Sequence, residues 1–98
     1  MVRPLKKRFL TGIPKAYYYK PQGIPLMILE EEVLEPDEFE ALKLHGSDDL
    51  NQVDAAEKMG VSQSTFARIL DRAYKKVSRA IVLGKAIRIE KNDTTNKK

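Results

Sequence analysis

The chain has 98 residues, contains no cysteine and carries a formal net charge of +4 at pH 7. A chain of this length forms one domain and buries roughly 60 to 65% of the surface that the unfolded chain exposes, so its core is modest. The absence of cysteine excludes disulfides, thiolate metal sites and a cysteine nucleophile. Because the apolar runs are short and no signal-peptide pattern is present, we expect a soluble, cytoplasmic protein that does not cross a membrane.

Positive and negative charges are segregated along the chain. Residues 1–25 hold six basic groups and no acid, residues 26–57 hold eleven acids and one base, and residues 58–91 hold nine bases and two acids. The net charges of these segments are therefore +6, −10 and +7, and the last seven residues add +1. A polyanion would be attracted by both ends of the chain and repelled by its middle, which predicts the side from which DNA approaches.

The first 25 residues are predicted to form a basic extended arm. Four of the five prolines lie there, and they leave no helix of useful length. Short extended pieces are expected around residues 7–10 and 16–20. The basic run of this arm consists of Arg3, Lys6, Lys7 and Arg8. It is expected either to reach a DNA minor groove or phosphates, or to be an ordinary solvated terminus.

Three consecutive tyrosines, Tyr17 to Tyr19, lie between Lys15 and Lys20. Aromatic rings flanked by basic side chains can stack on unpaired nucleotides. The simpler interpretation, which we favour, is that alternate tyrosines anchor a strand in a small core.

The acidic segment from residue 26 opens with either a short strand or an irregular lead-in over residues 26–34. A helix should begin at Glu35-Pro36-Asp37-Glu38, because proline is preset for the first helical position and the acids complement the helix dipole. It should end near His45 and Gly46, with Gly46 in the left-handed conformation and His45 as a capping residue. The glutamates have no spacing that separates a metal or acid/base site from a solvated acidic face. We expect neither an enzyme nor a bound metal or cofactor.

Two further helices are predicted, Gln52–Met59 and Gln63–Leu83. Asn51 and Ser62 are typical N-cap residues, and Gly60 breaks the chain between the helices. The second helix carries an apolar stripe with spacings of three and four, formed by Phe66, Ile69, Leu70, Ala73, Val77, Ala80 and Ile81. Its C-terminal half is expected to be a rod on which other elements pack.

Residues 52–79 predict a DNA-binding motif. The apolar contacts that a helix-turn-helix requires fall at Ala55, Met59, Val61, Phe66 and Ile69. The major groove of B-DNA is about 12 Å wide and admits one helix, whose first turns meet the base edges. The alternative is two packed helices with a solvated basic face. We expect residues 26–90 to form a mainly α helix-turn-helix domain that binds double-stranded DNA.

The turn determines which residues would meet DNA. The candidates for base contacts are Ser62, Gln63, Ser64, Thr65, Ala67 and Arg68. The amide of Gln63 suits adenine, the guanidinium of Arg68 suits guanine, and the methyl group of Ala67 suits that of thymine. The candidates for phosphate contacts, which position a protein without reading sequence, are Lys58, Arg72, Lys75 and Lys76.

Residues 85–90 alternate, with Ile87 and Ile89 on one side, and predict a short half-buried β-strand near the C-terminus. Its partner must be the N-terminal segment or a strand of another protomer. Because one recognition helix also reads few base pairs, we expect a homodimer. Residues 91–98 are polar and are predicted to be a disordered tail.

The chain resembles a known family over about residues 19–90. The motifs that carry the resemblance are, in order, YKPQGIPL, EEEVLEPDEFEALKL, AAEKMGVSQSTFARIL and GKAIRIE. They resemble the uncharacterised family of small bacterial and archaeal predicted DNA-binding proteins numbered one hundred and thirty-four among domains of unknown function. That family is similar to the fourth region of sigma factors, so the resemblance implies a sigma-region-four-like helix-turn-helix and a transcriptional regulator. Members often have Arg in place of Gln63 and Gly in place of Ala67, so no shared target sequence is implied.

Two other functions remain open from the sequence. The acidic helix that begins near Glu35 would suit an adaptor that docks on the transcription machinery, RNA polymerase included, with little or no DNA contact. The basic arm and the tyrosines would suit an RNA-binding protein.

Overall fold

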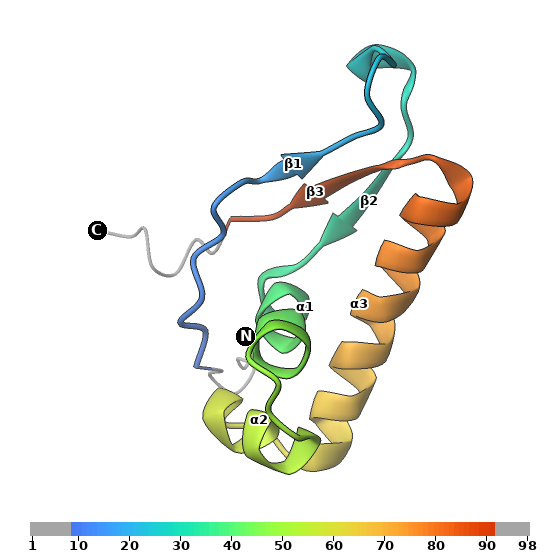
Figure 1. Cartoon of the computed structure of the whole chain (residues 1–98). Coiled ribbons are helices and arrows are strands. Elements are labelled where there is room, and N and C mark those ends of the chain that lie inside the picture. The colour runs from blue at the N-terminus through green and yellow to red at the C-terminus, as the bar shows by residue number, and fades with distance from the viewer. Residues whose placement is uncertain (1–8, 92–98) are drawn as a thin grey trace, which may run out of the picture.

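The computed structural model describes residues 9–91 of the chain, shown in Figure 1. The fold is mainly helical with a small three-stranded sheet. Its elements in chain order are the strand β1 (Tyr18–Tyr19), the 3-10 turn η1 (Leu26–Ile28), the strand β2 (Glu31–Leu34), the helix α1 (Pro36–Ala41), the π-helix η2 (Leu42–Ser47), the helices α2 (Gln52–Met59) and α3 (Gln63–Leu83), and the strand β3 (Ala86–Ile89). Helix α3 runs along the molecule, with α2 beside its first turns and the sheet beside its later ones (Figure 1).

The predicted C-terminal strand is confirmed, and as β3 it occupies the centre of the sheet. The strand order is β1-β3-β2, with β1 antiparallel and β2 parallel to β3. Tyr18 lies opposite Arg88, and Leu34 lies opposite Ile89. Both partners of β3 come from its own chain, so an unpaired strand no longer argues for a dimer.

Residues 9–25 bond to other elements of the domain and contribute the strand β1 to its sheet. The N–H of Phe9 donates to the carbonyl oxygen of Met59 at 2.9 Å, and the N–H of Gly12 donates to Oε1 of Glu40 at 2.7 Å. A Cβ at Gly12 would lie 2.6 Å from Cδ of Lys43, so a larger residue here would displace that side chain. Proline prevents a helix here, but it leaves the other backbone groups free to bond to distant elements.

Some predictions fall on parts of the chain outside residues 9–91. The basic run of Arg3, Lys6, Lys7 and Arg8 lies there, as does the predicted tail beyond Lys91.

The core consists of two apolar clusters that share α3. The cluster at the start of α3 consists of Ala41, Leu44, Ala55, Ala56, Met59, Phe66 and Ile69. The cluster beneath the sheet consists of Leu34, Ala73 and Ile89, against which Phe39, Leu42, Val77 and Ile87 pack. The apolar positions predicted around the turn between α2 and α3 are therefore confirmed, with Val61 packed against the first cluster.

The ends of α2 and α3 follow the predicted signals. Asn51 Oδ1 accepts from the N–H of Asp54 at 2.8 Å, and Ser62 Oγ accepts from the N–H of Thr65 at 3.1 Å. Gly60 ends α2 with φ of 72°, in the left-handed region where a Cβ is unfavourable. Both helices have the predicted bounds because these capping signals are local and do not depend on tertiary contacts.

The cap of the acidic helix was predicted wrongly, although its helical turns end at Ser47, close to the predicted end. Helix α1 stops at Ala41, the chain continues as the π-helix η2, and the left-handed residue is Asp49, with φ of 66°, rather than Gly46. The wider turn is closed by a 2.7 Å hydrogen bond from the N–H of Asp48 to the carbonyl oxygen of Lys43. Ala41 and Leu44 both enter the core from this stretch.

The prediction for Ile81 is also wrong. Ala80 is buried, but Ile81 is 74% exposed, because the sheet covers only one side of α3 and the next residue lies about 100° further round the helix. Val77 does pack beneath the sheet, so the rod role predicted for the C-terminal half of α3 holds for that residue.

Candidate nucleic-acid interface

The surface predicted to meet DNA lies where α2 ends and α3 begins. The turn between the two helices covers only Gly60, Val61 and Ser62. Phe9 covers this turn, since a Cβ built on Gly60 would lie 3.0 Å from its ring. No role for Phe9 was predicted from the sequence, where the one signal for it is an aromatic residue directly after a basic run.

The predicted base-contacting residues are brought together on the first two turns of α3. Gln63, Ser64, Ala67 and Arg68 are exposed, whereas Thr65 is half-buried. Ser62 is exposed as well, but its hydroxyl accepts from the N–H of Thr65 and lies 2.9 Å from Thr65 Oγ1, to which it donates. Ser62 therefore caps the helix, and four side chains remain free to face a ligand.

The predicted phosphate contacts divide into two pairs. Lys58 and Lys75 are exposed, and Lys75 has only a weak, solvated pair with Asp71 at 3.3 Å. Arg72 and Lys76 instead point toward α1 and bond to a buried carboxylate, that of Glu38. Spacing along the helix could not reveal this, because the partner lies more than thirty residues earlier in the chain.

Glu38 is the centre of an ionic cluster that joins α1 to α3. Its side chain is 1% exposed and accepts from Lys76 Nζ at 2.8 Å and Arg72 Nε at 3.0 Å. It also accepts from the N–H of Glu35 at 2.9 Å, as part of a capping box at the start of α1. Burial raises the pKa of Glu38, but the hydrogen bonds from Lys76, Glu35 and Arg72 outweigh it and lower the pKa below 4.5.

A second set of ion pairs neutralises the glutamates of β2. Glu32 accepts from Arg79 Nε and from Lys85 Nζ, each at 3.1 Å, and these bonds lower its pKa. Glu31 accepts from the hydroxyl of Tyr18 at 2.7 Å and from Arg88 Nε at 3.1 Å, and these bonds lower its pKa as well.

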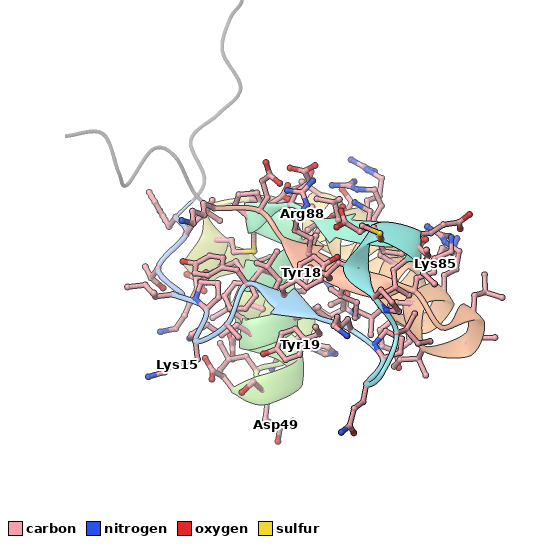
Figure 2. All side chains as sticks on the ribbon, turned by 90° about the horizontal axis from the view of Figure 1, so that it is seen from above. Lys15, Tyr18, Tyr19, Asp49, Lys85 and Arg88 are labelled. Atoms are coloured by element: carbon pink, nitrogen blue, oxygen red, sulfur yellow. The ribbon has the colours of Figure 1, made fainter. Side chains whose placement is uncertain are left out.

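Figure 2 shows where these groups lie. Tyr18 and Arg88 are side by side on adjacent strands, and Lys85 lies toward the other end of the sheet. The hydrogen bond to Glu31 raises the pKa of the Tyr18 hydroxyl.

The acidic middle of the chain is therefore not the free acidic face that the sequence predicted. Glu38 and Glu40 are buried, and the glutamates of β2 pair with bases from α3 and β3. Charges that are segregated along the sequence are largely combined in the fold. The approach of a polyanion thus depends on the bases that lack an acidic partner, and on the acids that stay exposed beside them, among which are Asp54 and Glu57 of α2.

Few strong bases on α2 and α3 are free of such pairing. Among residues 9–91, Lys58 and Arg68 have no acidic group within 4.0 Å, and both are exposed near the turn. They lie near the turn, as do the exposed side chains of Gln63 and Ser64, which carry uncharged hydrogen-bonding groups.

His45 bonds to the loop that follows η2 and not to the helix end that it was predicted to cap. Its Nδ1 donates to the carbonyl oxygen of Leu50 at 2.8 Å, and its ring meets Phe66 edge-on with centroids 6.5 Å apart. Within the described part of the chain, no three His, Asp or Glu side chains are grouped as a metal ion would need. No helix in that same part is long and apolar enough to cross a bilayer.

Comparison with known proteins places the chain in a family without an assigned function. Residues 1–97 match the family described as "Protein of unknown function DUF134", and the chain belongs to that family. The family membership suggested by the sequence motifs is thereby confirmed. No solved structure matches the chain significantly.

Similar proteins carry only family names. A UPF0251 protein of Desulforudis audaxviator is 51% identical over 90 residues, which cover 92% of this chain and 59% of that protein. A UPF0251 protein of Dehalococcoides mccartyi is 50% identical and covered over 77% of its length, and one of Caldanaerobacter subterraneus is 46% identical and covered over 76%. The chain thus spans between about three fifths and three quarters of these relatives.

Proposed function

We propose that this chain binds double-stranded DNA and acts as a transcriptional regulator, with α2 and α3 as a helix-turn-helix similar to that of sigma factor region four. Helix α3 is the recognition helix and enters the major groove with its first two turns. Helix α2 lies across the phosphate backbone. RNA polymerase is a further partner in this proposal, as it is for sigma factors.

The observation that carries the proposal is the exposed, unpaired Arg68 beside Gln63, directly after a three-residue turn. A guanidinium without an acidic partner costs little to transfer onto a base edge, since no existing ion pair has to break. Arg reads guanine and Gln reads adenine, each through two hydrogen bonds. The methyl group of Ala67, on the same exposed surface, suits contact with thymine.

The remaining residues around the turn have complementary roles. Lys58 and Lys75 contact phosphates and set the register of the protein on the duplex. Arg72 and Lys76 contribute indirectly, because their bonds to Glu38 fix α3 on α1. A recognition helix that is held rigidly loses less conformational entropy on binding.

The two alternative functions receive less support from the fold. An adaptor would need a free acidic helix, but two glutamates of α1 are buried and tied to other elements. RNA binding through the tyrosines would need their rings free, and the hydroxyl of Tyr18 is bonded to Glu31, although Tyr19 is 53% exposed. We therefore place duplex DNA first.

Selection from a random duplex pool, followed by fluorescence anisotropy across a salt series, tests the proposal. We expect affinity to fall steeply as salt rises, because phosphate contacts release counterions. Arg68→Ala should weaken binding to the selected duplex by about 5- to 150-fold, corresponding to about 1 to 3 kcal/mol, with a much smaller effect on random duplex. Lys75→Ala should weaken both equally and reduce the salt slope by about 1.

Arg79→Ala is the matched control. It removes the same charge from the same helix, but Arg79 bonds to Glu32 and lies some three turns beyond Arg68. It should change the affinity by less than about twofold. If Arg68→Ala and Arg79→Ala weaken binding equally, or if salt has no effect, α3 does not read DNA.

A further inference from the structure

A group of large apolar residues is exposed at the end of the molecule far from the turn. These residues and their exposed fractions are Leu26 54%, Met27 89%, Ile28 70%, Ile81 74%, Val82 78% and Leu83 61%. The first three form η1 and the last three end α3. We call this group the apolar tip.

The two halves of the apolar tip flank one contact. The N–H of Ala86 donates to the carbonyl oxygen of Glu30 at 2.9 Å, and Lys85 Nζ lies 3.6 Å from Glu30 Oε1. Glu30 follows η1 by two residues, and Lys85 follows α3 by two residues, so the two apolar segments lie on either side of this contact. Figure 1 shows η1 and the end of α3 at one end of the molecule and α2 at the opposite end.

The apolar tip exposes a large total area. Taking roughly 200 Å² as the full surface of a large apolar residue, the exposed fractions of its two segments together leave about 800 Å² accessible. A stable protein interface buries about 800 Å² on each partner. The apolar tip thus has the area that one half of such an interface requires.

We propose that the apolar tip is the interface of a homodimer, in which the tips of two copies pack against each other about a two-fold axis. A two-fold interface joins a surface to itself, so a charge that lies close to the axis meets its own copy. Neither half of the apolar tip contains a charged residue, whereas much of the rest of a chain with net charge +4 carries ionised side chains. Apolar surface is self-complementary without any such repulsion.

This interface does not depend on DNA binding. It lies at the opposite end of α3 from Arg68, so the dimer leaves the predicted recognition surface open. Failure of the dimer and failure of the DNA-binding proposal are therefore measured separately, by sedimentation without DNA and by anisotropy with it.

Sedimentation equilibrium of the full chain gives the first test. We expect a mass near twice 11.2 kDa at micromolar concentrations, falling to the monomer mass in Met27→Lys and in Val82→Lys. Both side chains are mostly exposed, so circular dichroism should show an unchanged fold. Val53→Lys is the matched control, because Val53 is 54% exposed on α2, far from the apolar tip, and this variant should remain dimeric.

Cross-linking locates the interface directly. The chain has no cysteine, so Met27→Cys or Val82→Cys introduces a single thiol. Mild oxidation joins two thiols as a disulfide when the interface brings their Cα atoms within about 7 Å. A bifunctional maleimide of 10 to 15 Å reach covers the wider range that a two-fold axis allows. Covalent dimers should form at these positions and not in Val53→Cys.

Three outcomes would overturn the proposal. A wild-type chain that is monomeric at about 100 μM has no such interface. A dimer that persists in both lysine variants is formed by another surface. A monomer that floats with phosphatidylcholine vesicles, and loses this property in Met27→Lys, uses the apolar tip to bind lipid.

Discussion

Replacing Glu38 by Gln tests whether the ionic cluster between α1 and α3 stabilises the domain. Gln has nearly the shape of Glu and retains an oxygen for the N–H of Glu35, so the substitution removes mainly the charge. It leaves Lys76 and Arg72 without the carboxylate to which they bond at 2.8 and 3.0 Å. The change therefore isolates the charged part of the interaction.

The expected loss is about 2 kcal/mol. Removing one partner of a fully buried ion pair costs about 3 to 5 kcal/mol. The two cations stay partly solvated, since the side chain of Lys76 is 23% exposed and that of Arg72 is 52% exposed. The loss of unfolding free energy is therefore smaller here. A domain of this size is stable by roughly 5 to 15 kcal/mol, and 2 kcal/mol lowers its Tm by about 10 °C.

Urea denaturation followed by circular dichroism at pH 7 measures this loss. A double-mutant cycle with Lys76→Met should give a coupling energy of about 1 kcal/mol or more between the two residues. Asp71→Asn is the control, since it breaks an exposed pair with Lys75 and should cost less than about 0.5 kcal/mol. If Glu38→Gln costs no more than Asp71→Asn, the cluster does not stabilise the fold.

Two further predictions concern pH and the turn. Because the pKa of Glu38 is lowered in the folded state, its carboxylate stabilises the fold above pH 4.5, and this stabilisation is lost as the pH falls through the folded pKa. Urea midpoints measured from pH 7 to pH 3 should therefore decline below about pH 4.5. The decline should be less steep in Glu38→Gln. Gly60→Ala and Gly84→Ala both place a Cβ at a φ near 70°, but only the Cβ at position 60 would be crowded, by the ring of Phe9. Measured by urea denaturation, Gly84→Ala should lower the free energy of unfolding by about 1 kcal/mol, and Gly60→Ala by about 1 kcal/mol more. Equal losses would mean that the Phe9 ring moves aside at no cost.

Local signals predicted the helical half of the fold. The N-caps Asn51 and Ser62 and the glycine at position 60 act within three or four residues, so the bounds of α2 and α3 follow from sequence. The exposed start of α3 follows as well, because its apolar stripe leaves Gln63 and Arg68 outside.

Contacts between distant segments could not be predicted from the sequence. Glu38 and Lys76 are 38 residues apart, and no spacing rule links them, so the acids were taken for a free face and the bases for phosphate ligands. The same holds for the N-terminal segment, whose polar backbone bonds to Glu40 without any pattern in its own residues. The π-helix, closed by the bond from Asp48 to Lys43, has no signal in the sequence comparable to an N-cap.

The central position of β3 has a consequence for biosynthesis. The helices need only neighbouring residues to begin forming, but β1 and β2 do not pair with each other and both depend on β3, which follows them in the chain. During translation the first two strands must remain unpaired until residues 86–89 have left the ribosome. The sheet is thus completed only after the helices have been synthesised, when its closing pairings span as many as 70 residues.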